Sequence, residues 1–119
     1  KDKMTDKYMT VVETAEFIRF AKEYLTEDER KELIDYLASN PTAGDLIRET
    51  GGLRKLRWAR KNQGKSGSYR VIYFFYNETI PLFMISGFAK NVMENISPAA
   101  CKQYAKLLKE LVKQYKGAN

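Results

Sequence analysis

The chain has 119 residues, of which 44% are hydrophobic, and this is enough for one domain over residues 1–119 with a buried core. Its formal net charge of +6 favours nucleic acid or an acidic protein as a partner. The sequence contains no histidine and a single cysteine, Cys101, which excludes a Ser-His-Asp or Cys-His catalytic site and an internal disulfide within these residues.

Other classes of protein are disfavoured by what the sequence lacks. It contains no apolar run long enough to span a membrane and no signal-peptide pattern. It also has no helix with a strongly basic face beside an exposed apolar one, so we expect no membrane partner. One cysteine fits a reducing compartment, and we expect a cytoplasmic protein. Without histidine, the commonest ligand of transition metals is missing, and we expect neither a metal nor another cofactor.

The chain is predicted to begin with a short strand and a helix. Residues 1–7 are polar, and we expect them to be disordered. Residues 8–12 favour a β-strand, and Thr14 is a suitable N-cap because its hydroxyl can accept a bond from a free N–H of the first turn. The helix that follows has one apolar face, formed by Phe17, Ile18, Ala21, Tyr24 and Leu25.

A second helix is predicted from the capping-box pattern of Thr26 and Glu29. It should end before Asn40, because a residue that precedes proline avoids the helical region. Its predicted buried residues are Leu33, Ile34, Leu37 and Ala38. Most of the acidic residues lie in or beside these two helices, which we expect to form a hairpin. The domain is therefore predicted to have an acidic face and a basic one.

A basic β-hairpin follows an irregular connection over Pro41–Gly52. Its strands are predicted at Leu53–Trp58 and Tyr69–Tyr76, with a loop between them. No Asp or Glu lies between Gly51 and Asn77, whereas the same window contains the seven cations Arg54, Lys55, Arg57, Arg60, Lys61, Lys65 and Arg70. This much uncompensated positive charge indicates an anionic ligand, with an ordinary solvated surface as the alternative.

Alternation along the first strand separates its residues into two faces. If Leu56 and Trp58 point into the core, Lys55 and Arg57 stand side by side on the open face. The second strand is apolar on both faces, which is typical of a central strand, and Arg70 at its start is the exception. Antiparallel pairing can bring Arg70 close to Lys55 and Arg57, but the sequence does not fix the register.

The last predicted elements are a strand at Leu82–Phe88 and a helix with Ser97 as N-cap and Pro98 at its first position. Cys101 lies on the apolar stripe of that helix, so we interpret it as a core residue and not as a nucleophile. The order β-α-α-β-β-β-α predicts an α+β fold: a small antiparallel β-sheet packed against an N-terminal helical hairpin, with a C-terminal helix. Periodicity does not show whether this helix covers the sheet.

In this order and spacing, the segments resemble the RelE-like toxins of bacterial type II toxin–antitoxin systems, within the RelE/ParE superfamily, and among them the HigB-type branch. The resemblance extends from Val11 to Tyr115. The motifs that carry it are Gly51-Gly52-Leu53-Arg54-Lys55-Leu56-Arg57, Gly64-Lys65-Ser66-Gly67, Tyr69-Arg70-Val71-Ile72-Tyr73 and Lys90-Asn91. It implies a microbial ribonuclease-like fold and a ribosome-dependent endoribonuclease, or mRNA interferase, that needs no metal.

The resemblance also implies partners and site residues. The partners are the ribosome, mRNA and a cognate antitoxin, which is often a helix-turn-helix protein. The toxin would contact operator DNA only through this antitoxin. By position, the catalytic residues are Lys55, Arg57, Arg70 and Lys90. We expect contacts with RNA or the ribosome from Arg54, Arg60, Lys61, Lys65, Tyr76 and Asn91. The implied reaction is attack of the RNA 2′-hydroxyl on the adjacent phosphate. Lys and Arg can stabilise its charge, while the proton acceptor stays open, with Lys55 a candidate.

Two alternatives keep this fold. A ParE-like toxin would act on a topoisomerase and would not need phosphate ligands along one strand face. A non-catalytic RNA-binding module would use the same basic face without chemistry. Tyr73 or Tyr76 could stack a base, although for Tyr73 a place in the sheet core is favoured. For Arg70, the alternative to a phosphate contact is an ion pair with Glu94 or with an acid of the helical hairpin.

Overall fold

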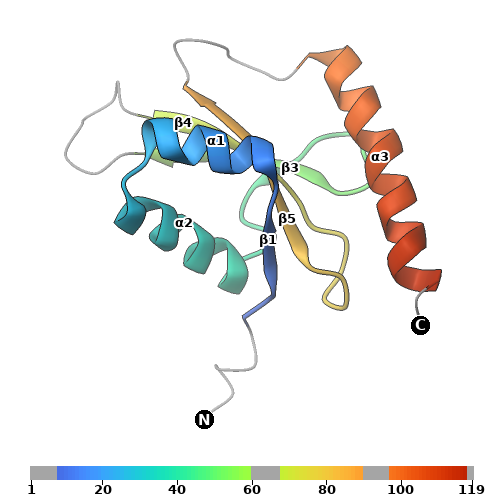
Figure 1. Ribbon diagram of the computed structural model, residues 1–119. Coiled ribbons are helices and arrows are strands. Elements are labelled where there is room, and N and C mark those ends of the chain that lie inside the picture. Colours follow the sequence, from blue (N-terminus) through green and yellow to red (C-terminus); the bar gives the residue numbers. More distant parts are fainter. Residues whose placement is uncertain (1–7, 60–67, 90–96, 118–119) are drawn as a thin grey trace.

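The computed structural model describes residues 8–59, 68–89 and 97–117, and within them three helices and five strands. In chain order these are β1 (Val11–Glu13), α1 (Ala15–Tyr24), α2 (Glu27–Ser39), β2 (Asp45–Leu46), β3 (Leu53–Ala59), β4 (Ser68–Phe74), β5 (Leu82–Ala89) and α3 (Pro98–Gly117). The strands form one sheet in the order β1-β5-β4-β3-β2. Helices α1 and α2 lie on one side of this sheet and α3 on the other (Figure 1).

The two N-terminal helices begin at the caps that the sequence predicts. The hydroxyl of Thr14 accepts a hydrogen bond from the N–H of Phe17 at 3.2 Å and caps α1. Thr26 and Glu29 satisfy each other's backbone N–H groups at 2.8 and 3.0 Å, which is the predicted capping box of α2. The helix ends at Ser39, immediately before the Asn-Pro pair, as expected.

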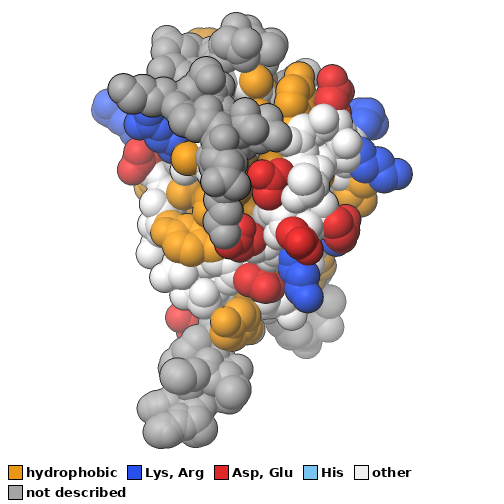
Figure 2. Space-filling model, turned by 90° about the vertical axis from the view of Figure 1, so that its left-hand side faces the viewer, with side chains coloured by type: hydrophobic (Ala, Val, Ile, Leu, Met, Phe, Trp, Pro, Cys, Tyr) orange, Lys and Arg blue, Asp and Glu red, His pale blue; other side chains and the backbone are white. Residues whose placement is uncertain are grey.

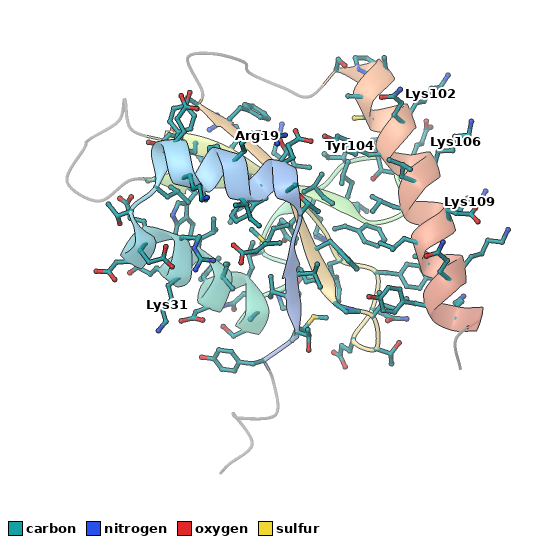
Figure 3. The ribbon with its side chains drawn as sticks, viewed as in Figure 1. Arg19, Lys31, Lys102, Tyr104, Lys106 and Lys109 are labelled. Carbon is teal, nitrogen blue, oxygen red and sulfur yellow. The ribbon has the colours of Figure 1, made fainter. Side chains whose placement is uncertain are left out.

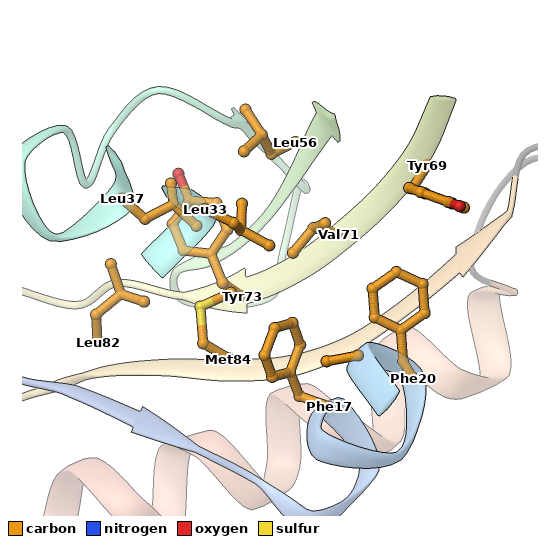
Figure 4. Packing of buried hydrophobic residues seen from close by; sticks show 11 residues of the cluster. Phe17, Phe20, Leu33, Leu37, Leu56, Tyr69, Val71, Tyr73, Leu82 and Met84 are labelled. Carbon is orange, nitrogen blue, oxygen red and sulfur yellow. The ribbon is translucent and has the colours of Figure 1, made fainter. Parts of the chain in front are cut away.

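The sheet separates two apolar cores because its side chains alternate between the two faces. The core beneath α1 and α2 contains Phe17, Phe20, Ala21, Leu33, Leu37, Leu56, Tyr69, Val71, Tyr73, Leu82 and Met84, and Figure 4 shows how most of them meet. The core beneath α3 contains Leu53, Ile72, Phe74, Ile80, Phe83, Ile85, Phe88 and Leu108. The strand β4 contributes to both cores, which agrees with its prediction as a central strand.

The position of α3 was open from the sequence, and the structure shows that it covers part of the sheet. Leu108 is buried in the second core, and Tyr104 packs against it. At the other end of the helix, the ring of Tyr115 packs edge-on against Phe83 of β5, with the centroids 6.0 Å apart. The helix therefore forms one wall of that face of the sheet.

One predicted buried residue of α1 differs in the structure. Ile18 is 39% exposed, whereas Phe20, which the predicted apolar face omitted, is buried. The reason lies in β5, where a Cβ atom on Gly87 would sit 2.5 Å from ring atoms of Phe20. Because Gly87 has no side chain, the ring of Phe20 can pack against β5 at this point. The buried face of α1 therefore includes Phe20 in place of Ile18.

Two features of the sheet go beyond the predicted antiparallel hairpin. The strand β1 joins its edge in parallel with β5, with Val11 opposite Leu82. The stretch predicted as irregular contains β2, which pairs antiparallel with β3 over two residues. The sheet is therefore mixed, and β3 is not an edge strand over its first residues. In addition, β4 ends at Phe74, two residues before the predicted end.

The acidic residues of α1 and α2 form an exposed face, as expected from the sequence. The exposed ones are Glu16, Glu23, Glu27, Asp28, Glu32 and Asp35, and Figure 2 shows acidic side chains gathered on this side of the molecule. Arg30 lies among them and pairs with Glu13 at 2.6 Å and with Glu27 at 2.5 Å. Among the helices that the structure describes, none is long and apolar enough to cross a membrane.

Candidate nucleic-acid interface

Arg57 of β3 and Arg70 of β4 are directly opposite each other. Opposite residues of an antiparallel pair project to the same face, with their Cα atoms roughly 4.5–5.5 Å apart. The face is the one that α3 partly covers, because the next pair of the same parity is Lys55 and Ile72, and Ile72 lies in the second core. The predicted shared face of Lys55 and Arg57 is confirmed, and the register now places Arg70 beside Arg57.

The two arginines differ in exposure. Arg57 is exposed, whereas Arg70 is half-buried, and its Nη1 atom is buried without a hydrogen-bond partner in the described part of the chain. No acid of α1 or α2 forms an ion pair with Arg70, and Glu94 lies outside the described residues. A buried donor without a partner costs about 1–3 kcal/mol. The Arg70 guanidinium therefore keeps one donor that no residue of the described chain uses.

A carboxylate that sequence reasoning missed lies beside this basic face. Asp45 of β2 is directly opposite Lys55, on the other side of β3 from Ile72. Asp45 is exposed and Lys55 is half-buried. A carboxylate in this position can orient a lysine and can also accept a proton. No sequence pattern indicates this carboxylate, because a two-residue strand inside an irregular stretch has no periodicity to recognise.

Arg54 lies on the opposite face of the sheet from Arg57. Its guanidinium Nη1 donates to the carbonyl oxygen of Gly44 at 2.7 Å and to that of Thr42 at 3.4 Å. The side chain holds the segment that leads into β2, and its predicted contact with RNA stays a prediction. The alternation along β3 already indicates this orientation, because Arg54 and the core residue Leu56 are two residues apart and therefore point to the same face of the sheet.

The two candidate stacking tyrosines have different surroundings. Tyr73 is fully buried, and its hydroxyl donates to the carbonyl of Pro41 and accepts from the N–H of Gly44, each at 2.8 Å. Burial raises the pKa of Tyr73 above its ordinary value. The predicted core position of Tyr73 is confirmed. Tyr76 is 38% exposed, stacks on Phe74 with centroids 6.4 Å apart, and has the Nζ of Lys116 at 5.5 Å from its ring centroid.

The other predicted site residues lie outside the described residues. They are Arg60, Lys61 and Lys65 in the hairpin loop, and Lys90 and Asn91 after β5. Their roles stay predictions. Within residues 8–59, 68–89 and 97–117, no cluster of three or more Cys, Asp or Glu side chains could hold a metal ion. The described part of the site is thus the group Lys55, Arg57 and Arg70, with Asp45 beside it.

The comparisons with known proteins agree with the fold. The family model described as the RelE toxin of the RelE/RelB toxin–antitoxin system matches residues 9–118. The structure is similar to that of the E. coli toxin RelE, a double arginine-to-alanine mutant in the free state. The TM-score is 0.53 at 18% sequence identity, over 73% of this chain and 88% of that chain. This likeness shows the fold, while the HigB-type branch stays a prediction. Because the family model covers nearly all of its residues, the chain belongs to the RelE toxin family of toxin–antitoxin systems.

Proposed function

We propose that this RelE-family toxin is a ribosome-dependent endoribonuclease that cuts mRNA and so inhibits translation. The observation that carries the proposal is the Arg57–Arg70 pair: two permanent positive charges directly opposite each other, one with a buried donor that lacks a partner in the described chain. Like charges in this position repel and destabilise the sheet. A phosphate between them would reverse that effect, and guanidinium groups suit it by charge and by planar geometry.

The proposed reaction needs no group beyond the RNA and the side chains of the toxin. The 2′-hydroxyl oxygen attacks the adjacent phosphorus, and the bond from phosphorus to the 5′-oxygen breaks. The products are a 2′,3′-cyclic phosphate and a 5′-hydroxyl. The attacking oxygen loses one proton and the leaving oxygen gains one, so the reaction balances. Arg57 and Arg70 stabilise the charge that develops on the phosphate. Among the described residues, Lys55 and Asp45 opposite it form the pair best placed to transfer a proton.

The family also implies a cognate RelB-type antitoxin as partner. We propose that it silences the toxin either by covering Lys55, Arg57 and Arg70 or by forming a complex too bulky to enter the ribosome. A helix-turn-helix antitoxin would in addition bring the toxin to operator DNA. Charge complementarity favours an acidic segment over the basic face.

The test is cleavage of a defined mRNA on programmed ribosomes by the purified toxin, read by primer extension. Cleavage by the wild-type protein, lost in Arg57→Ala and kept in Arg19→Ala, supports the proposal. Arg19 is the matched control, because it is an exposed arginine on α1 (Figure 3), and α1 packs on the opposite face of the sheet. Intact mRNA with the wild-type toxin would overturn it, and inhibition of a topoisomerase in a parallel assay would then identify the ParE-like alternative.

A further inference from the structure

A small cavity lies between the helix α2 and the end of the strand β3, and its volume is about 270 Å³. It is lined by Glu29, Glu32 and Tyr36 of α2 and by Trp58 and Ala59 of β3. Sites for whole small molecules measure roughly 300–1,000 Å³, so this cavity suits a single side chain. Trp58 packs against the core beneath α1 and α2, whereas Arg57 lies on the other face of the sheet. The cavity is therefore separate from the candidate nuclease site.

Two aromatic rings form one wall of this cavity. The rings of Tyr36 and Trp58 have their centroids 5.6 Å apart and are inclined to each other at 46°. Tyr36 is 41% exposed and Trp58 is half-buried, so part of this aromatic surface is open to solvent. The face of an aromatic ring attracts a cation within about 6 Å of its centroid. A cation seated in the angle between the two rings can therefore contact both of them.

Two carboxylates lie on the same side of α2 as Tyr36. Glu29, Glu32 and Tyr36 follow one another at spacings of three and four residues, which places them along one face of the helix. One carboxylate oxygen of Glu29 accepts the N–H of Thr26 in the capping box, and this bond holds that side chain beside the cavity. Glu32 is exposed. The negative charge of both carboxylates adds to the attraction of the ring faces, so the whole lining favours a cation.

We propose that this cavity binds an arginine side chain from a basic segment of a partner protein. A planar guanidinium group stacks on an aromatic ring and donates two parallel hydrogen bonds to a carboxylate, and the ammonium group of lysine lacks this planar fork.

RNA fits the same cavity poorly. Its bases can stack on Trp58, but its phosphates would then lie close to the carboxylates of Glu29 and Glu32, and like charges repel. Binding of arginine here needs no RNA cleavage, so it can fail or hold independently of the nuclease proposal.

Trp58 is the only tryptophan in the sequence, so its fluorescence and its indole N–H signal report directly on this cavity. The full chain is titrated with a short capped peptide in which arginines alternate with glycines. In matched peptides, lysine or citrulline replaces arginine, and citrulline has the shape of arginine without its charge. We expect the arginine peptide to shift the Trp58 signals, the lysine peptide to bind more weakly and the citrulline peptide to leave the signals unchanged. Binding should weaken as salt is added, because salt screens exposed charges.

The matched variants are Glu32→Gln and Glu23→Gln. Both residues are exposed glutamates and the charge change is the same, but of the two Glu32 alone lines this cavity. Affinity for the arginine peptide should fall about fivefold or more in Glu32→Gln and by much less in Glu23→Gln, while both melting temperatures stay near wild type. Tyr36→Leu removes one ring but keeps an apolar side chain, and it should weaken binding as well.

Equal losses in the two glutamate variants would overturn the proposal. So would equal affinity for the arginine peptide and for either the lysine or the citrulline peptide. An oligouridylate is the RNA probe, and Trp58 signals that respond to it and not to the arginine peptide would overturn the proposal in favour of RNA.

Discussion

Arg57 and Arg70 face each other directly across β3 and β4, although both carry a permanent positive charge. Their repulsion is a cost that the folded protein bears without a ligand. An anion bound between them removes this cost and adds two charge-assisted contacts. The pair thus connects stability with function, since the arrangement that weakens the free protein is the one that prepares it for phosphate.

The first prediction concerns Arg57→Ala. Mutation of this exposed residue should leave the free energy of unfolding within ~0.5 kcal/mol of wild type or raise it, because one of two repelling charges is gone. Cleavage on ribosomes should fall ~10²-fold or more, as expected for a lost contact to the charge of the transition state. Urea unfolding and primer extension measure the two effects. A variant that unfolds much more easily, or one that cleaves at the wild-type rate, would remove Arg57 from the site.

The second prediction uses Arg70→Lys. Lysine keeps the charge but lacks the planar group that can donate two parallel bonds to phosphate. We expect a large loss in cleavage rate with little change in melting temperature. Arg19→Lys is the control for the same chemical change on another face. The opposite pattern, a lower melting temperature with cleavage per folded molecule unchanged, would show that Arg70 has a structural role.

Much of the fold follows from local signals in the sequence. Thr14, Thr26 and Ser97 mark helix starts through side chains that bond to nearby backbone groups, so no distant contact is needed to recognise them. The burial of Phe20 instead of Ile18 could not be predicted, because it depends on the missing side chain of Gly87 in a distant strand. The parallel pairing of β1 could not be predicted either. A strand of three residues has too few side chains for its pattern to indicate which strand it pairs with.

The candidate site divides in the same way. Alternation along one strand placed Lys55 and Arg57 together, because a period of two is a local property. The partner across the sheet depends on register, and only the structure identifies Arg70 as the residue opposite Arg57. Asp45 was missed because β2 exists through its pairing with β3 and not through its own sequence.

The third prediction concerns the buried hydroxyl of Tyr73. It bonds both to the carbonyl of Pro41 and to the N–H of Gly44, and thereby holds the segment that leads into β2. Tyr73→Phe leaves both groups without that partner and should lower the free energy of unfolding by about 1–3 kcal/mol. The control is Tyr8→Phe, since Tyr8 is 60% exposed. Urea unfolding measures both, and equal stability of the two variants would contradict the structural role.

The fourth prediction is loss of stability at alkaline pH. The pKa of Tyr73 is raised by burial, and the pKa of Tyr104 is raised by burial and by the carboxylate of Glu16. For each, the folded state favours the neutral phenol, so the stabilisation is fully present below the ordinary tyrosine pKa of 10.0 and is lost as pH rises toward the folded pKa. Urea midpoints should therefore fall above pH 10, and less steeply in Tyr73→Phe. A parallel fall in that variant would show that other groups cause it.

The fifth prediction tests the contact between α1 and β5. Gly87→Ala places a methyl group where ring carbons of Phe20 lie only 2.5 Å away. Phe20 or the helix must move, and we expect a loss of about 1–3 kcal/mol. The double variant Gly87→Ala with Phe20→Leu should recover part of this loss, because the smaller side chain gives up the contested space. Chemical denaturation of the single and double variants gives the coupling, and strictly additive losses would mean that the clash is relieved elsewhere.

The parallel strand β1 also sets the order in which the chain can fold during its synthesis. Val11 pairs with Leu82, so β1 must wait for β5, which is about 70 residues later in the chain, before the two can pair. Until then α1 lacks β5, the strand on which Phe20 packs beside Gly87. A nascent chain that ends at Asn77 contains the whole β3–β4 hairpin but no strand to receive β1. The sheet therefore closes only after β5 has been synthesised, although β1 is made long before it.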